Sequence, residues 1–534
     1  MTLSLRMDHS PESPSAACVA TAASRPDLTG LKGFSAWFRW SLVLVMILGV
    51  SLRVAYIAHE IYNPDEQTAQ AVVRGLSFPD QWDTNWAKND VSEIFHYNQY
   101  NFSSYHYLLY FWKSLIAVFA PDKVHHLGAL RTLNGLLGLV FMLAVALAMR
   151  KSIGEIAGIS AALAGAIIPL LVQDAHYLRC EAMLTTGVAI LIWSATWQEP
   201  LRPWWLLLFN GMIAGWLVAA KATMVLALPL LVLLLIPARS PNEKPWRLFC
   251  GQTGLISLGV ALGFVLGVPY GVAQPQLYLS GLAKLAAEYG HTPWPPYTSP
   301  DLAPSIGVAL DYMQSTLGWG FWLVTAFGSI GKIRACGWWR TTIMVLPLAA
   351  AFAVFGGHAY FSERSYSPFF PIVVLLFGAG VQFCIGAIVS FLGKLQSYRA
   401  ALVVVLLSTT LALPSFYSWQ IVAHGFSGRE QREKDAALTR MKGSLSGKVM
   451  VIIGSRFLAS DNRAITAALE RKEPVLAVIN DSYDSVTPRT LATLQGTFDA
   501  RLLGVRESLF PDIPTCTLHT FISPRLWLLY IPPK

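Results

Sequence analysis

The stretch GQTGLISLGVALGFVLGVP, residues 251–269, contains no ionisable side chain. An α-helix rises about 1.5 Å per residue, so a segment of this length reaches across the roughly 30 Å hydrocarbon layer of a membrane. Two further apolar stretches of similar length are Trp40–Ile57 and Leu130–Met149. Surface helices of soluble proteins carry a polar stripe, which these segments lack. They therefore predict membrane-spanning helices.

Composition extends this prediction to most of the chain. Of the 534 residues, 54% are hydrophobic and 13% are charged, whereas soluble proteins average roughly 25% charged residues. We therefore expect an α-helical polytopic membrane protein with a small C-terminal α/β domain. Eleven apolar segments are predicted spans, near residues 40–58, 128–149, 155–173, 181–197, 203–220, 222–237, 248–269, 316–331, 341–356, 369–389 and 400–419.

Charges between these segments predict the orientation of the chain. With the N-terminus in the cytoplasm, the inner loops carry 13 basic and three acidic residues. The outer segments before residue 420 carry 14 acidic residues. Cytoplasmic loops of membrane proteins are enriched in Lys and Arg, which favours this orientation over its reverse. An odd number of spans then places the C-terminus outside the cytoplasm.

Three regions follow from these patterns. Residues 1–35 are polar, rich in Ser, Pro and Ala, and lack the apolar core of a signal peptide, so they predict a disordered cytoplasmic tail. Residues 36–420 form the multi-span region, with long outer loops over 58–127 and 270–315. Residues 421–534 have an ordinary density of charge and predict the α/β domain, which lies outside the cytoplasm.

Strand-like runs in the last region are Val449–Ile453, Val475–Ile479 and Leu526–Ile531, with a helix-like stretch around Ala464–Arg471 between the first two. No glycine-rich phosphate loop or metal motif accompanies them, and we interpret this region as a structural or partner-binding domain. The six cysteines of the chain are scattered, so neither a disulfide framework nor a metal cluster is predicted.

Two adjacent carboxylates, Asp65 and Glu66, follow the first span in the run Asn63-Pro64-Asp65-Glu66-Gln67. Adjacent carboxylates near a bilayer repel each other and are costly to desolvate, which favours a catalytic role. An alternative is that Asp65 caps a helix over residues 66–75, with Glu66 in its first turn.

The same outer loop continues with dense aromatic, Asn, Ser and His residues from Glu93 to Tyr107. Aromatic rings suit a sugar-binding surface and are enriched at the membrane interface. His96, Tyr97 and Tyr105 are therefore candidate acceptor-binding or sugar-binding residues, together with Glu181 further along the chain. An interfacial helix over Tyr105–Phe119 is compatible with this. Neither His96 nor His106 has a second metal ligand at a fixed spacing, so no metal site is predicted.

Further polar residues interrupt apolar sequence at the predicted outer edge of the membrane. Arg179 and Glu181 lie in the turn between the third and fourth spans, Lys221 lies between the fifth and sixth, and Arg364 precedes the tenth. Cations at membrane depth favour an anionic ligand such as a lipid phosphate. The alternatives are snorkelling for Lys221 and a local ion pair with Glu363 for Arg364.

This ordered set resembles the C-type glycosyltransferases that use polyprenyl-phosphate sugars, and most closely the protein O-mannosyltransferase-like branch (family 39) and its bacterial relatives. The resemblance covers residues 35–420 and includes Glu288-Tyr289-Gly290-His291, similar to a Gly-His element of some relatives. Two departures are Glu181, where Asp is commoner, and Ser365, which separates Arg364 from Tyr366.

The resemblance implies transfer of one sugar from a polyprenyl phosphate to a lipid, glycan or protein acceptor outside the cytoplasm, with inversion. It implies that Asp65 is the general base and that Glu66 orients the base or the acceptor. Arg364, Lys221, Arg179 and His291 would hold the donor phosphate. A bacterial inner membrane is the implied location, no nucleic acid is a partner, and no cofactor is indicated, although a divalent cation remains an open alternative.

Two other functions remain open. A transporter or flippase also needs charged residues at membrane depth, but it predicts internal repeats that the sequence lacks. A non-catalytic scaffold does not account for the adjacent carboxylates or the long outer loops. The sequence does not identify the sugar, the acceptor, the polyprenyl length or the oligomeric state.

Overall fold

The computed structural model describes residues 35–58, 64–86, 99–196, 203–235, 245–291, 304–359, 361–392, 398–444, 449–453, 459–481, 487–506 and 525–533. The predicted N-terminal tail lies outside these residues, apart from Ser35.

The multi-span region is built almost entirely from helices. Its longer helices are α1 (Ala36–Val54), α2 (Pro64–Gly75), α4 (Ser103–Phe119), α5 (Leu127–Ser152), α6 (Glu155–Ile167), α8 (Glu181–Ala195), α9 (Trp204–Ala220), α10 (Pro245–Gly267), α12 (Pro275–His291), α13 (Ile306–Cys336), α14 (Trp338–Gly357), α15 (Phe370–Leu392) and α16 (Arg399–Gln420). Shorter elements are η2 (Pro121–Lys123), α7 (Pro169–Ala175), η3 (Ala222–Leu234), α11 (Pro269–Ala273), η4 (Glu363–Ser365), η5 (Ser367–Phe369) and the π-helical η7 (Ile421–Phe426).

The predicted number of eleven spans is not confirmed. Among the described residues, six helices are long and apolar enough to cross a membrane, and the count rises to seven if the bent pair α6–α7 forms one span. Each remaining predicted span still coincides with a helix, namely α8, α9, η3 and part of α13. The chain is therefore a multi-pass membrane protein, and its number of spans stays a prediction.

Local geometry distinguishes two of these helices, η3 and α13, from a straight α-helical span. η3 is a 3₁₀ helix of 13 residues, and because a 3₁₀ helix rises about 2.0 Å per residue, it reaches about 26 Å despite its length. α13 has 31 residues and is kinked at Gly318, whose φ of 80° lies in the left-handed region. A glycine adopts that conformation without the steric cost that a Cβ would add.

Small residues allow the close approach of α9 to α10. A Cβ added at Gly215 would lie 2.0 Å from the carbonyl oxygen of Val260, and one added at Gly263 would lie 2.0 Å from that of Met212. The backbones therefore approach closely over this pair, as small residues permit in membrane helices.

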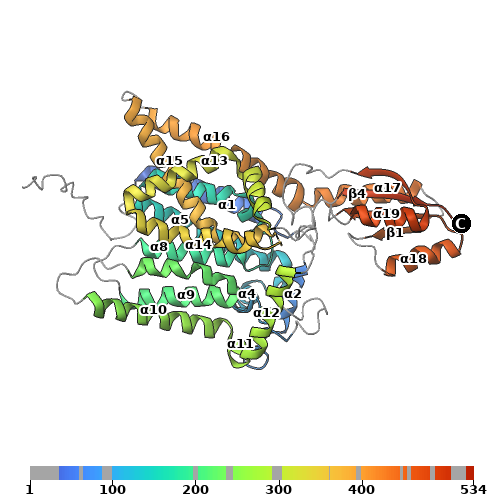
Figure 1. Cartoon of the computed structure of the whole chain (residues 1–534), viewed down its shortest axis with the longest axis horizontal. Helices are drawn as coiled ribbons and strands as arrows, with labels where there is room; N and C mark the ends of the chain where they lie inside the picture. The colour runs from blue at the N-terminus through green and yellow to red at the C-terminus, as the bar shows by residue number, and fades with distance from the viewer. Residues whose placement is uncertain are drawn as a thin grey trace, which may run out of the picture.

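The described parts of the two predicted outer loops contain helices that gather at one end of the bundle. The first contains α2 and α4, and the second contains α11 and α12. In Figure 1 these four helices lie at the end of the bundle that faces the C-terminal domain, to which α16 and η7 lead. The candidate site is therefore on the same side of the helical bundle as that domain.

The C-terminal domain is a small α/β fold. Its strands β1 (Val449–Ile453), β2 (Val475–Asp481), β3 (Arg501–Arg506) and β4 (Arg525–Ile531) form a sheet in the order β1-β2-β4-β3. β1 and β2 are parallel and are joined through α18 (Ala459–Glu470), whereas β4 is antiparallel to both of its neighbours. The helices α17 (Arg429–Ser444) and α19 (Thr487–Phe498) complete the domain. The three strands predicted from the sequence are present.

Candidate active site

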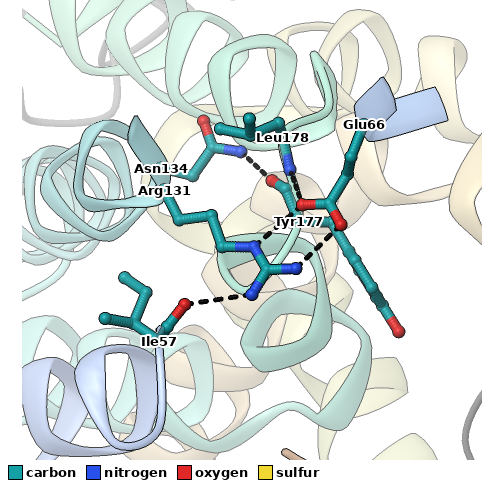
Figure 2. A network of polar contacts seen from close by, with 6 residues as sticks. All are labelled: Ile57, Glu66, Arg131, Asn134, Tyr177 and Leu178. Carbon is teal, nitrogen blue, oxygen red and sulfur yellow. Dashed lines mark hydrogen bonds and ion pairs between the residues drawn. The ribbon is translucent and has the colours of Figure 1, made fainter. Parts of the chain in front are cut away.

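Glu66 is buried and forms an ion pair with Arg131 of α5 (Figure 2). Arg131 Nε donates to Glu66 Oε1 over 2.8 Å, and Nη2 donates to Oε2 over 2.8 Å. The backbone N–H of Leu178 donates to the same Oε1 over 2.7 Å, and Arg131 Nη1 donates to the carbonyl of Ile57 over 3.0 Å. Glu66 thus joins the start of α2 to α5 and to the turn between α7 and α8.

Asn134, one helical turn after Arg131, holds the same turn in place. Its side-chain amide donates to the carbonyl of Tyr177 and, over 3.1 Å, to that of Arg179. Its carbonyl oxygen accepts from the hydroxyl of Tyr105 over 3.2 Å. Burial raises the pKa of the Tyr105 hydroxyl, which therefore remains a donor. The backbone of the turn is thus held by Asn134 of α5, whose side chain is oriented by Tyr105 of α4.

The turn itself carries ring contacts that connect it to η7. The ring of His176 stacks on that of Phe426, with centroids 4.0 Å apart and an interplanar angle of 4°. Tyr177 meets the same ring edge-on, and the Arg179 guanidinium lies over the Tyr177 ring, 4.7 Å from its centroid. A cation over an aromatic face is attracted to it. The start of the C-terminal region is thus packed against the turn.

Positively and negatively charged side chains lie close together beside this turn. Lys221 Nζ lies 3.4 Å from Glu181 Oε1, and the Glu181 side chain is 1% exposed. Arg364 and Arg179 also interact electrostatically with Glu181. The buried carboxylate of Asp174 interacts with the same group of charges, and Thr185 of α8 donates to the backbone carbonyl of Ser367 in η5 over 3.1 Å. Three distant segments of sequence therefore supply one charged cluster.

The first outer loop is attached directly beside Lys221. The backbone N–H of Phe102 donates to the carbonyl of Ala220 over 2.9 Å, and Ser104 Oγ donates to the carbonyl of Trp216 over 2.8 Å. Lys221 lies at the junction of α9 and η3 with an extended backbone (φ −151°, ψ 114°). The interruption between α9 and η3 places the Lys221 side chain beside Glu181. The hydrogen bonds from Phe102 and Ser104 hold this interruption in position.

A second attachment joins the two outer loops. The Tyr100 hydroxyl lies 3.3 Å from Asp83 Oδ2 and 3.1 Å from the side-chain oxygen of Gln274, between α11 and α12. Burial, and then the charge of Asp83, raise the pKa of Tyr100. Because Tyr100 is 1% exposed, this contact is part of the folded core.

The predicted site residues separate into three groups. Lys221, Arg179, Glu181 and Arg364 are brought together, with Glu66 attached to the same turn through Leu178. Tyr105, a candidate acceptor-binding or sugar-binding residue, is 1% exposed, and its hydroxyl donates to Asn134. His96 and Tyr97 lie outside the described residues, as do the side chains of Asp65 and His291.

The backbone around Asp65 bears on the capping alternative. α2 begins at Pro64, so Asp65 lies inside the first turn of the helix and does not precede it. A proline at the first helical position is common, because the missing N–H has no partner there in any case.

Sequence reasoning missed Arg131, Asn134 and Asp174 as members of the site. A signal for Arg131 was present, because a charge inside an apolar span must face a partner in the protein interior. Among the described residues, no group of three or more His, Cys, Asp or Glu side chains is arranged to hold a metal ion.

Comparison with known proteins supports one class of function. A family model described as dolichyl-phosphate-mannose-protein mannosyltransferase matches residues 109–263, which confirms the resemblance to that branch over this stretch. The match supports a membrane glycosyltransferase with a lipid-linked donor. No curated protein matches the sequence significantly.

Several solved structures are similar to the chain. ArnT from Cupriavidus metallidurans in the apo state has 13% identity and a TM-score of 0.49, over 93% of this chain and 98% of that chain. ArnT bound to undecaprenyl phosphate has the same identity and TM-score, over 92% and 98%. The oligosaccharyltransferase AglB from Archaeoglobus fulgidus, in complex with an inhibitory peptide and a dolichol-phosphate, has 12% identity and a TM-score of 0.47, over 72% of this chain and 55% of that chain.

Proposed function

We propose that the chain transfers one sugar from a polyprenyl-phosphate donor to an acceptor outside the cytoplasm, with inversion at the anomeric carbon. The observation that carries this proposal is the cluster of Lys221, Arg179 and Arg364 around the buried Glu181. The cluster also contains the buried carboxylate of Asp174, and its three cations suit the binding of a further anion. The family match over residues 109–263 supports a polyprenyl phosphate as this anion.

In the proposed reaction, Asp65 acts on the acceptor, and the three cations act on the leaving phosphate. The acceptor hydroxyl attacks the anomeric carbon while Asp65 takes its proton, and the bond between that carbon and the phosphate oxygen breaks. The leaving polyprenyl phosphate keeps the electron pair. Lys221, Arg179 and Arg364 stabilise the charge that grows on its oxygen, which fixed cations do well in a site that excludes water.

The Glu66–Arg131 pair has a supporting role in this proposal. Glu66 is the neighbour of Asp65 in the first turn of α2, and both of its carboxylate oxygens are engaged by Arg131 and Leu178. The pair therefore fixes the helical turn that carries the proposed base. His291, Tyr97 and His96 remain candidates for contacts with the donor or the sugar.

The test uses the full chain in liposomes with a panel of undecaprenyl-phosphate sugars labelled in the sugar. We expect labelled product and release of undecaprenyl phosphate from one donor of the panel when membrane extracts supply acceptors. Movement of the intact lipid across the bilayer without cleavage would favour the transporter. Failure of every donor to be cleaved, together with no binding of undecaprenyl phosphate, would contradict the proposed function.

A further inference from the structure

α7, the helix that carries Asp174, is the second half of a helix that is interrupted at Ile168. α6 and α7 meet at Ile168, just before Pro169, with a bend of 61°. Pro169 has no backbone N–H, so it cannot make the bond to the carbonyl of Gly165 that a continuous helix would contain. The last carbonyls of a helix need other donors, and within a membrane water does not supply them.

Side chains from two other helices supply these donors. Arg53 of α1 donates through Nη2 to the carbonyl of Gly165 over 2.7 Å and through Nη1 to that of Ala166 over 2.9 Å. Ser418 of α16 donates to the carbonyl of Ile167 over 2.5 Å. Three consecutive carbonyls at the end of α6 are thus satisfied by a guanidinium and a hydroxyl.

The surroundings of Arg53 are shaped for this contact. The residue is 1% exposed, and Nη1 also donates to the carbonyl of Gly49 one turn earlier in α1, over 3.1 Å. A Cβ added at Gly138 of α5 would lie 2.6 Å from Arg53 Nε and 2.7 Å from its Cδ. A positive charge at the C-terminus of α6 is also favoured by the helix dipole. The planar, forked guanidinium presents several donors in a fixed geometry, which suits two adjacent carbonyls.

α1 also contacts the other end of α7. His176, the residue after α7, lies with Nε2 3.0 Å from the carbonyl of Ala55, just after the end of α1. Arg53 and Ala55 are two residues apart; Arg53 holds the end of α6, and Ala55 contacts the residue that follows the seven-residue α7. Asp174 lies between these two attachments and interacts electrostatically with Arg53.

We propose that Arg53 is a positioning residue, whose guanidinium caps the broken end of α6 and thereby fixes the direction in which α7 presents Asp174 to the charged cluster. This inference rests on the proposed function for its effect on catalysis, whereas the capping itself is independent of it. If α7 pointed in another direction, Asp174 would be displaced. Displacements of about 1 Å can lower a reaction rate about 100-fold.

The test compares Arg53→Met, Pro169→Ala and the double variant in detergent. Met fills a similar length without donors, and the alanine of Pro169→Ala supplies an N–H that can bond to the carbonyl of Gly165. We expect Arg53→Met to lower the apparent Tm, and to lower it less when Pro169→Ala is present. Equal shifts in both backgrounds would overturn the capping. This comparison needs no activity, so it remains decisive if the proposed function fails.

The effect of Arg53 on catalysis is measured as the transfer rate of the same variants. We expect Arg53→Met to lower kcat at least 10-fold, and the double variant to regain thermal stability while kcat stays low, because its α7 points in a different direction. Recovery of kcat together with Tm would show a purely structural role and overturn the positioning. Gly138→Ala, which displaces the guanidinium without removing it, should lower kcat in the same way. Gly254→Ala is the matched control, because a Cβ at Gly254 meets no atom within 4 Å.

Discussion

The carboxylate of Glu66 and the guanidinium of Arg131 lie side by side, joined by two contacts of 2.8 Å between residues 65 positions apart. Both side chains are almost fully buried. A buried pair of this kind is weak evidence for net stability, since both charges lose their hydration. Its geometry nevertheless fixes the start of α2 against α5, one residue from Asp65.

Removing one partner of this pair should be far more damaging than removing both. Glu66→Gln leaves the charge of Arg131 uncompensated, which typically costs about 3–5 kcal/mol for a buried pair. The double variant Glu66→Leu with Arg131→Met should lose less stability than either single variant, measured as the apparent Tm in detergent. As a control, Glu433→Gln breaks the exposed pair with Arg429 and should change Tm little. Additive losses at Glu66 and Arg131 would show that the two charges do not depend on each other.

Orientation of the chain is a separate prediction from the loop charges. A reporter fused after Lys534 should be non-cytoplasmic, and one inserted between Arg239 and Arg247 should be cytoplasmic. Finding both reporters on one side of the membrane would refute the predicted topology. It would also remove the basis for placing the candidate site outside the cytoplasm.

The cations of the cluster should act on the donor. Lys221→Ala and Arg364→Ala each remove a charge from the proposed phosphate site, and a hydrogen bond to a charged group contributes about 1.5–3 kcal/mol. We expect the apparent KM for the donor to rise about 10-fold or more, with a smaller effect on the acceptor. Arg463→Ala, an exposed position in α18 of the C-terminal domain, is the control. An unchanged donor KM in both site variants would remove them from the phosphate site.

His176 predicts how stability depends on pH. Burial lowers its pKa from 6.5 to about 4, although its contacts with two backbone carbonyls act in the opposite direction. The unfolded chain therefore binds a proton at this residue before the folded chain does, so stability is full above pH 6.5 and falls as the pH drops toward 4. His176→Gln should lose this part of the pH dependence. An identical change of Tm with pH in the variant and the wild type would show that His176 is not responsible.

The helices and strands could be predicted from the sequence more completely than the contacts between their side chains. Each apolar segment forms a helix because backbone groups in a membrane must be satisfied within the segment. The same rule does not reveal whether a helix spans the membrane fully. η3 differs from a straight α-helical span because it is a 3₁₀ helix, and the pair α6–α7 differs because it is bent by 61° before Pro169. Short apolar runs were sufficient to predict three strands of the C-terminal domain.

The candidate site was only partly predictable for a related reason. Polar residues such as Lys221 and Glu181 stand out in apolar sequence, and their clustering follows from their common depth in the membrane. Partners such as Arg131 for Glu66, or Arg53 for the carbonyl of Gly165, depend on how distant helices pack together. No periodicity or spacing in one sequence contains that information.

Asp65 gives the most specific prediction about catalysis. Asp65→Asn keeps the shape of the side chain but cannot accept a proton, and loss of a general base typically lowers the rate by a factor of about 10²–10⁴. Asp65→Glu should also be slow, because the added methylene moves the carboxylate by roughly 1 Å.

A purely structural role for Asp65 makes a different prediction. Since Asp65 lies in the first turn of α2, its charge would favour the helix by about 0.3–1 kcal/mol through the dipole, so the Asn variant would be slightly less stable but fully active. The decisive measurement is transfer from a labelled polyprenyl-phosphate sugar, with variants matched for folding by their apparent Tm. Gln67→Glu, which changes the charge two residues away on the same helix, is the control and should retain transfer. Near-normal transfer by Asp65→Asn would exclude Asp65 as the base and leave Glu181 as the next carboxylate to test, because Glu66 is already held by Arg131.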